Sequence, residues 1–172
     1  MLQSEKLNLE RIQFLVVDDN IHSRDITTAV VTGFGARHVL KSESAKKARD
    51  LVCSNIIDVL LIAGRMPDED GYSFVRWMRR QAPEANRFIP VIVLSAHTRR
   101  SQVFEARDCG VHAIIAKPLV PKTLLERTVW MAKDKRMFIE SDNYIGPDRR
   151  FKNLGPPEGM IEQRSDALAL DD

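Results

Sequence analysis

The stretch Asp58-Val59-Leu60-Leu61-Ile62-Ala63-Gly64-Arg65-Met66-Pro67 lies at the centre of the predicted fold. Its apolar run, residues 59–63, follows an acidic residue and precedes glycine and proline. A short run with these neighbours is typical of a strand that is buried on both faces of a parallel sheet. In open parallel sheets the functional groups gather beyond the carboxyl ends of the strands. The residue that leaves this strand at that edge is Ala63.

Strand and helix patterns alternate on both sides of this stretch. They predict strands at 12–17, 37–40, 59–63, 91–94 and 113–116, and helices at 21–34, 44–53, 72–81, 99–108 and 121–136. Asp70 is expected to cap the third of these helices. Five strands that alternate with five helices predict a doubly wound α/β domain with a parallel sheet, flavodoxin-like in outline.

The composition of the chain indicates one domain with an extension. Of its 172 residues 44% are hydrophobic, and the formal net charge of +2 is too small to indicate a nucleic-acid partner. Cys53 and Cys109 form neither a disulfide framework nor a metal motif, which favours a reducing compartment. No apolar run approaches the roughly 20 residues of a membrane span, and the N-terminus lacks a secretory signal. We therefore expect a cytoplasmic protein.

The last part of the chain differs from the rest. We expect three parts: a lead-in over 1–10, the domain over 11–137, and an irregular C-terminal extension without its own core over 138–172. Prolines and glycines disfavour regular structure in the extension. Tyr144, Ile145 and Phe151 are the side chains that we expect to lie against the domain.

Polar residues stand where three other predicted strands end. They are Asp18 and Asp19 after the first strand, Ser95 after the fourth and Lys117 after the fifth. A cation relieves the repulsion between adjacent carboxylates, and such an oxygen site suits Mg²⁺. The Ser95 hydroxyl can donate a hydrogen bond to a phosphoryl oxygen, and the Lys117 ammonium can neutralise its charge. A carboxylate at the end of the central strand would complete a phosphoryl-accepting site.

Between residues 12 and 136 the chain resembles the receiver domain of two-component response regulators, in its single-domain, CheY-like form. The motifs that carry the resemblance are Asp18-Asp19, Met66-Pro67, Asp70-Gly71, Ser95-Ala96 and Lys117-Pro118. Each pair alone is common, but together at the ends of the correct strands they are specific. The resemblance implies the strand order 2-1-3-4-5. It also implies a Mg²⁺ site formed by Asp18, Asp19 and the backbone carbonyl of Arg65.

The resemblance also implies partners. A receiver takes a phosphoryl group from a histidine kinase or a histidine phosphotransferase and signals to a downstream protein by contact. Receivers bind partners or form homodimers through the face that corresponds here to 99–108, 113–116 and 121–136, where Arg99 and Arg100 are candidate contacts. We expect no DNA or membrane partner and no enzymatic activity, since the extension is too short for an output domain with its own core.

The decisive departure from the family lies at Ala63. The family's phospho-acceptor aspartate precedes the Met-Pro proline by four residues, and that position here is alanine. A methyl group forms no acyl phosphate, so we expect a non-phosphorylatable chain with weak Mg²⁺ binding. Asp58 cannot replace the acceptor because it lies at the other end of the strand, roughly 16 Å away at about 3.3 Å per residue. The aromatic switch position, three residues before Lys117, is Ile114, so any switch is expected to act through Ser95 and the following loop.

Two explanations of the alanine stay open. The chain is either a stand-alone receiver whose acceptor has been replaced by engineering, or a natural pseudo-receiver that binds partners without phosphate. In the second case Arg149 and Arg150, beside aromatic residues, are candidate contacts to a nucleotide such as cyclic di-GMP. For the chain as it stands, we expect Lys117→Ala to have little effect and Asp18→Asn to raise stability in metal-free buffer.

Overall fold

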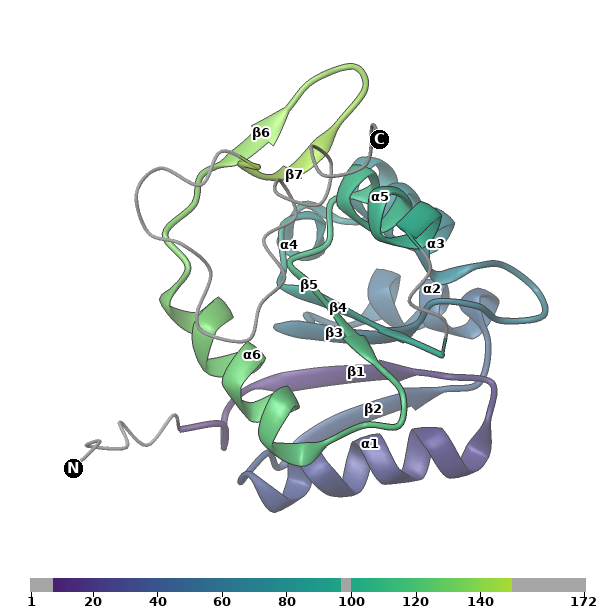
Figure 1. Ribbon diagram of the computed structural model, residues 1–172, viewed down its shortest axis with the longest axis vertical. Helices are drawn as coiled ribbons and strands as arrows, with labels where there is room; N and C mark the ends of the chain where they lie inside the picture. The colour runs from purple at the N-terminus through teal and green to yellow at the C-terminus, as the bar shows by residue number, and fades with distance from the viewer. Residues whose placement is uncertain (1–7, 97–99, 150–172) are drawn as a thin grey trace, which may run out of the picture.

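The computed structural model describes residues 8–96 and 100–149, the side chains of 100–103 excepted. The elements, labelled in Figure 1, are β1 (Gln13–Val17), α1 (Ile21–Gly33), β2 (His38–Ser42), α2 (Ala45–Ser54), β3 (Val59–Ala63), α3 (Gly71–Gln81), α4 (Glu84–Arg87), β4 (Val91–Ser95), α5 (Arg100–Cys109), β5 (Ala113–Ala116), α6 (Pro121–Lys133), β6 (Phe138–Glu140) and β7 (Ile145–Pro147). The predicted strands and helices are all present, with ends that differ by a few residues. No helix in these described ranges is long and apolar enough to cross a membrane.

The central sheet has five parallel strands in the order β2-β1-β3-β4-β5 (Figure 1). This order confirms the doubly wound, flavodoxin-like α/β fold. β3 is the central strand, since its Leu60 pairs with Leu15 of β1 and with Val91 of β4. All five residues of β3 are buried. The carboxyl ends of the neighbouring strands therefore lie around the end of β3.

Helices cover both faces of this sheet. On one face, Val31 of α1 and Leu124 of α6 belong to a single buried apolar cluster with the strands. On the other face, Ala48 of α2, Phe74 of α3 and Ala106 of α5 belong to a second cluster. Successive strand residues alternate between the two clusters because strand side chains point to opposite faces. Burial of both clusters supplies the main free energy of folding.

The first turn of α3 packs directly on the end of β3. The Asp70 side chain accepts a hydrogen bond from the backbone N–H of Ser73, which confirms the predicted helix cap. The helix begins with Gly71, where a Cβ would lie 2.1 Å from the carbonyl oxygen of Ala63. Glycine is therefore required at this close approach, which brings α3 beside the carboxyl edge of the sheet.

The sequence patterns do not predict α4 or the pair β6 and β7. α4 is a single turn after Pro83 and carries Asn86, whose side chain donates to the carbonyl oxygens of Val52 and Asn55. β6 and β7 form an antiparallel hairpin. The expectation of an irregular extension is therefore wrong for residues 138–147.

The hairpin escapes the sequence pattern because each of its strands has only three residues and β7 reads Ile-Gly-Pro. The Tyr144 hydroxyl donates to the carbonyl oxygen of Pro147 at 2.7 Å, which supports the turn from within. Tyr144 and Ile145 are buried, and β7 contacts α3, as expected for side chains that lie against the domain. Phe151 lies outside the described residues.

The hairpin lies at the amino-terminal edge of the sheet, beside α3 and α5 (Figure 1). Its Phe138 ring centroid is 4.9 Å from the guanidinium carbon of the buried Arg79. That guanidinium donates four hydrogen bonds, at 2.7–3.1 Å, to the backbone carbonyl oxygens of Arg87, Ile89 and Gly110. The hairpin thus covers a buried cation that the backbone holds.

Candidate functional site

Asp18 is a buried carboxylate at the end of β1. Its Oδ2 accepts hydrogen bonds from the Nζ of Lys117 and from the Oγ of Ser23, both at 2.6 Å. Its Oδ1 accepts one from the backbone N–H of Asn20 at 3.0 Å. The fold therefore brings the predicted acidic residue of the first strand and the predicted lysine of the fifth into direct contact, and both carboxylate oxygens have partners.

Lys117 and Ser95 leave neighbouring strands side by side. The backbone N–H of Lys117 donates to the carbonyl oxygen of Ser95 at 2.8 Å, and Ser95 pairs with Ala116 in the sheet. The peptide bond between Lys117 and Pro118 is cis. Ser95 is only 5% exposed, so its side chain belongs to the interior of this edge.

Ala63 lies between these groups at the end of the central strand. It is buried and pairs with the residue before Ser95. On its other side, the preceding residue of β3 pairs with the residue before Asp18. The methyl group of Ala63 therefore stands between the two at the position where the resemblance implies a carboxylate. Asp58 is at the opposite end of β3, where its Oδ2 accepts from the backbone N–H of Gln13 at 2.7 Å.

The two acidic neighbours have different environments. Asp18 is 1% exposed and paired with Lys117, whereas Asp19 is exposed to solvent. Replacing Asp18 would therefore weaken a buried ion pair instead of relieving a repulsion. The structure reverses the two expectations drawn from the sequence: Asp18→Asn and Lys117→Ala should both lower stability.

Tyr72 is a residue of this edge that the sequence analysis does not identify. Its ring is buried in the apolar cluster that contains Ala63, and a Cβ built on Gly64 would lie 3.2 Å from its hydroxyl. Burial raises the pKa of Tyr72, and the Ser95 side chain partly opposes that increase. The signal available in the sequence is its position, since it is an aromatic residue directly after the capping turn that follows β3.

A pocket of about 280 Å³ lies at this edge of the sheet. Its lining consists of Gly64, Arg65, Met66, Asp70, Tyr72 and Glu105. One cationic and two acidic side chains give the pocket mixed charge. Arg65 is exposed and borders the pocket, so the residue predicted to offer its carbonyl to a metal does lie at this edge.

Other predicted residues lie elsewhere. Ile114 is half-buried and packs against the apolar cluster shared by α2, α3 and α5. It pairs with Val93 of β4, so it lies in the sheet and its side chain contributes to the core. Arg99 and Arg150 lie outside the described residues, as does the side chain of Arg100.

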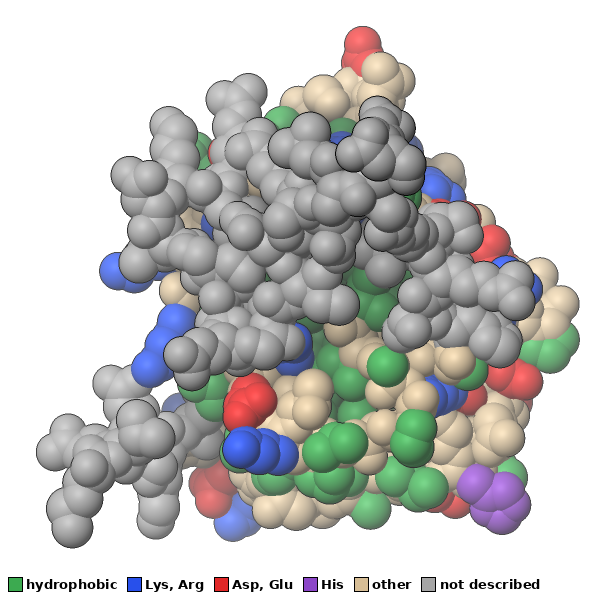
Figure 2. Space-filling model, viewed as in Figure 1, with side chains coloured by type: hydrophobic (Ala, Val, Ile, Leu, Met, Phe, Trp, Pro, Cys, Tyr) green, Lys and Arg blue, Asp and Glu red, His purple; other side chains and the backbone are tan. Residues whose placement is uncertain are grey.

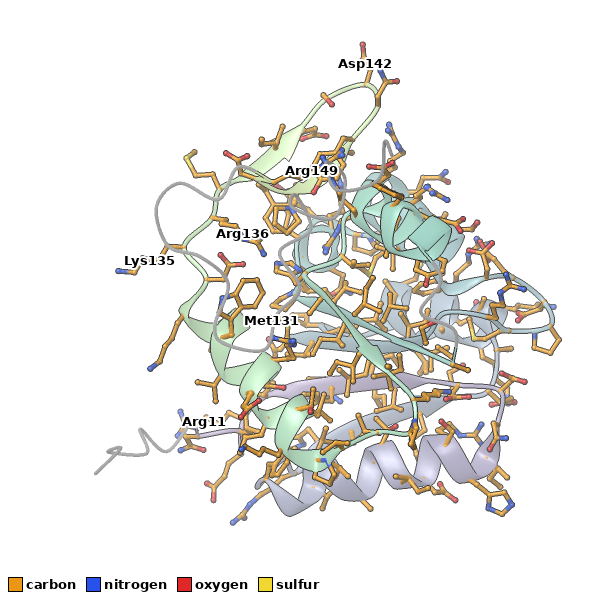
Figure 3. The ribbon with its side chains drawn as sticks, viewed as in Figure 1. Arg11, Met131, Lys135, Arg136, Asp142 and Arg149 are labelled. Carbon is orange, nitrogen blue, oxygen red and sulfur yellow. The ribbon has the colours of Figure 1, made fainter. Side chains whose placement is uncertain are left out.

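Arg149 lies at the end of the hairpin, near α5 (Figure 3). Its Nη1 donates to Oδ1 of Asp108 at 2.7 Å, and its guanidinium carbon is 3.7 Å from the ring centroid of Tyr144. Asp108 belongs to the last turn of α5, at the amino-terminal edge of the sheet. The candidate nucleotide contact is therefore engaged within the protein, away from the carboxyl edge.

The described residues do not form a complete magnesium site. Among them, no group of three or more His, Cys, Asp or Glu side chains could hold a metal ion. Asp19 offers an exposed carboxylate, but Asp18 shares one oxygen with the Lys117 ammonium. Ala63 contributes no oxygen. This donor set does not fit tight binding of Mg²⁺.

Comparisons with known proteins agree with this arrangement. The family model for the response regulator receiver domain matches residues 14–129. The chain is similar to a chemotaxis protein CheY homolog of Campylobacter jejuni, with 31% identity over 67% of this chain and 88% of that protein. It is also 34% identical, over 64% of its length, to a protein-glutamate methylesterase/protein-glutamine glutaminase of Myxococcus xanthus, but spans only 31% of that protein.

A solved structure shows the same fold. The receiver domain of the histidine kinase CKI1 from Arabidopsis thaliana, complexed with Mg²⁺, matches with a TM-score of 0.62 and 25% identity. The match covers 71% of this chain and 96% of that one. Because the family model spans more than half of the chain and the sheet order agrees with it, the chain belongs to the family of response regulator receiver domains.

Proposed function

We propose that the chain is a receiver in two-component or phosphorelay signalling that acts through protein–protein contacts, in a form that cannot be phosphorylated at Ala63. The observation that supports this most is the grouping of Asp18, Ser95 and Lys117 around the end of β3. They supply a carboxylate, a hydroxyl and an ammonium around a position that holds only a methyl group. Signalling by contact needs no catalytic group of the chain's own, so we propose no enzymatic activity.

In a form that carries aspartate at position 63, the reaction at this edge would be phosphoryl transfer. A carboxylate oxygen would attack the phosphorus of the donor, and the donor atom bonded to it would leave with the bond's electron pair. The Lys117 ammonium, which is now paired with Asp18, would stabilise the charge on the phosphoryl oxygens. The Ser95 hydroxyl would donate to one of them. In the present chain Lys117 keeps Asp18 as its partner and the transfer does not occur.

The phosphodonor protein is proposed to dock on α1. This helix starts directly after the acidic pair, and Ile21 and Ile26 are 56% and 54% exposed. Val120, in the loop between β5 and α6, is also exposed. Figure 2 shows hydrophobic side chains gathered over α1. Exposed apolar side chains that cluster beside a site are typical of a protein contact.

A matched pair of variants tests this docking face. Ile26→Glu should weaken binding to the histidine kinase or histidine phosphotransferase. Ile56→Glu changes an even more exposed isoleucine, but it lies before β3 at the opposite edge and should leave binding unchanged. Equal affinities of the two variants in a binding titration would rule out α1 as the docking face.

Downstream proteins, or a second copy of the chain, are proposed to bind the face formed by α5, β5 and α6. Phe104 of α5 is 43% exposed there and offers an apolar contact. A homodimer through this face should weaken in Phe104→Ser. Analytical sedimentation of the unchanged chain and of Phe104→Ser at several concentrations would measure the difference in dimer affinity.

Phosphoryl uptake tests the proposed function. Ala63→Asp and the unchanged chain are incubated with acetyl phosphate and Mg²⁺, and their intact masses are measured. Ala63→Asp should gain the mass of one phosphoryl group, while the unchanged chain should gain none. Ala63→Asn is the matched control, because it has a similar size without a nucleophilic carboxylate. No uptake by Ala63→Asp, or equal uptake by all three proteins, would refute the proposal.

A second candidate function is that of a pseudo-receiver, which binds its partners without phosphate. The ion pair of Asp18 with Lys117 favours it, because the charges of this edge are balanced without a phosphoryl group. Recovery of the same partners by the unchanged chain and by phosphorylated Ala63→Asp would support it. The cyclic di-GMP form of this candidate gains no support from Arg149, whose guanidinium already contacts Asp108 and Tyr144. Calorimetric titration with cyclic di-GMP should show no binding.

A further inference from the structure

We propose that the Tyr72 hydroxyl is the hydrogen-bond partner through which Ser95 reports the state of the site to α5. The inference deepens the proposed function and rests on it for the phosphorylated state. Contact between the two side chains can be tested in the present chain without phosphorylation.

The Tyr72 hydroxyl is a buried polar group that can form a hydrogen bond but has no partner for it in the described part of the chain. The residue is 2% exposed, and its oxygen has no hydrogen-bond partner among the residues that the structure describes. A buried hydroxyl without a partner destabilises the fold, so its presence at this edge calls for an explanation. We explain it as a group that gains its partner in another state of the site.

The position of the hydroxyl identifies that partner. A Cβ built on Gly64 would lie 3.2 Å from the Tyr72 oxygen and 3.4 Å from Cγ1 of Val93, so the hydroxyl lies over the ends of β3 and β4. Val93 and Ser95 are two residues apart in β4, and their side chains therefore point to the same face of the sheet. The Ser95 side chain also lies close enough to lower the pKa of Tyr72, against the larger opposite effect of burial.

The fifth strand of this chain has no aromatic residue that could form a hydrogen bond with Ser95. Receivers carry a switch aromatic on the fifth strand, and this chain has Ile114 there, beside Val93. Tyr72 belongs to the apolar cluster between the sheet and α3, and Ile114 packs against the same cluster. The phenol of Tyr72 thus approaches the end of β4 from α3, whereas the fifth strand offers no polar ring.

α5 is the element that the contact would move. It follows Ser95 in the chain, and its Ala106 and Cys109 are buried in the same cluster as Tyr72. A hydrogen bond that draws Ser95 and the Tyr72 hydroxyl together changes the packing surface on which α5 rests. Because packed cores have discrete arrangements, a small shift of the ring would be transmitted to the helix.

The first test measures the contact in the present chain. The sequence contains two tyrosines, so incorporation of 3-fluorotyrosine gives two fluorine resonances, assigned with Tyr72→Phe. Ser95→Ala should shift the Tyr72 resonance and leave that of Tyr144, which lies in the hairpin at the other edge. Ser95→Thr retains the hydroxyl and should give a smaller shift than Ser95→Ala. An unchanged Tyr72 resonance in Ser95→Ala would overturn the inference.

The second test measures transmission to α5. Amide hydrogen exchange is followed in Ala63→Asp and in its combinations with Tyr72→Phe and Tyr144→Phe, at equal phosphoryl occupancy set by intact mass. Phosphorylation should change exchange in α5 in the parent and in the Tyr144→Phe combination, and this change should be lost with Tyr72→Phe. Retention of the change with Tyr72→Phe, or no change in the parent, would overturn the inference. If Ala63→Asp takes up no phosphoryl group, the proposed function fails instead, and the fluorine spectra still decide the contact.

Discussion

The two edges of the sheet hold a buried charge in different ways. At the carboxyl edge, the Asp18 carboxylate is neutralised by the side chain of Lys117. At the amino edge, the Arg79 guanidinium has no carboxylate partner among the described residues and donates to backbone carbonyl oxygens. Burial lowers the pKa of Arg79 to about 9, which leaves it charged at neutral pH.

The difference separates the edge of the proposed site, the functional edge, from a structural edge. Backbone carbonyls cannot move away from Arg79 without unfolding the segments that carry them, so that cation belongs to the fold. The Lys117 ammonium is held by one side chain and can exchange Asp18 for another anion. The edge that can change partners is therefore the one with the missing carboxylate at Ala63, and the edge that cannot is closed by the hairpin.

The largest expected effect is at the structural edge. Arg79→Leu leaves the carbonyl oxygens that accepted its hydrogen bonds buried without donors, and should lower the free energy of unfolding by about 4 kcal/mol. Arg80→Leu is the control, since the neighbouring Arg80 is exposed and donates to the Asp142 carbonyl at the hairpin tip (Figure 3). Urea unfolding measures both. Similar losses of unfolding free energy in the two variants would mean that the buried hydrogen bonds of Arg79 stabilise the fold no more than the exposed one of Arg80.

Loss of the lysine tests the functional edge. Lys117→Ala leaves the Asp18 carboxylate buried without its counter-charge, and should lower the free energy of unfolding by about 2–3 kcal/mol. Lys122→Ala removes an exposed lysine in the first turn of α6 and should have no measurable effect. If Lys117→Ala were as stable as Lys122→Ala, the ion pair would contribute nothing to the fold.

Two glycines test how tightly the hairpin closes the structural edge. Gly110 and Gly35 both have positive φ, at 91° and 101°, so alanine strains the backbone at either position. A Cβ on Gly110 would lie 2.1 Å from the carbonyl oxygen of Ile145, whereas one on Gly35 would meet nothing within 4 Å. Gly110→Ala should therefore lose about 2 kcal/mol more than Gly35→Ala. Equal losses in thermal unfolding would show that the hairpin does not press on Gly110.

His112, which lies at the structural edge, should make the free energy of unfolding depend on pH. Burial, followed by the charges of Arg79 and Arg136, lowers the pKa of His112 well below 6.5, and its Nδ1 accepts from the Val91 N–H. In the unfolded chain this histidine takes up a proton near its ordinary pKa. Stability should thus fall as the pH falls below 6.5, by at most about 1.4 kcal/mol per pH unit.

Variants of the histidines isolate this contribution. His112→Asn keeps an acceptor for the Val91 N–H without a titrating group, and should flatten the pH dependence of urea unfolding between pH 7 and 5. His22→Asn changes an exposed histidine and should leave the dependence as it is. The same slope in both variants would mean that His112 is not the source.

The fold could be predicted from sequence because its signals are local. The apolar run at 59–63 and the turn residues around it suffice to place the central strand, and motif spacing suffices to place Asp18, Ser95 and Lys117 at strand ends. What the sequence could not give is the pairing of side chains across the edge. The Lys117 ammonium pairs with the buried Asp18 carboxylate, and this pair reverses the effect expected for Lys117→Ala.

Tyr72 and the hairpin were not predicted, for a different reason. A tyrosine on the buried side of α3 looks like any core aromatic, and only its distance from Gly64 shows that its hydroxyl reaches the site. The strands of the hairpin are too short to show alternation, and they are ordered by contacts with distant residues such as Arg79. Long-range contacts of this kind leave no periodic trace in a sequence.

Magnesium-dependent stability tests most directly whether one carboxylate is what the functional edge lacks. Urea unfolding of the unchanged chain and of Ala63→Asp is compared in EDTA and in Mg²⁺. The unchanged chain should have the same free energy of unfolding in both buffers. Ala63→Asp should gain about 2.7 kcal/mol when Mg²⁺ is present at one hundred times its Kd. An equal gain in both proteins, or no gain in Ala63→Asp, would contradict the account.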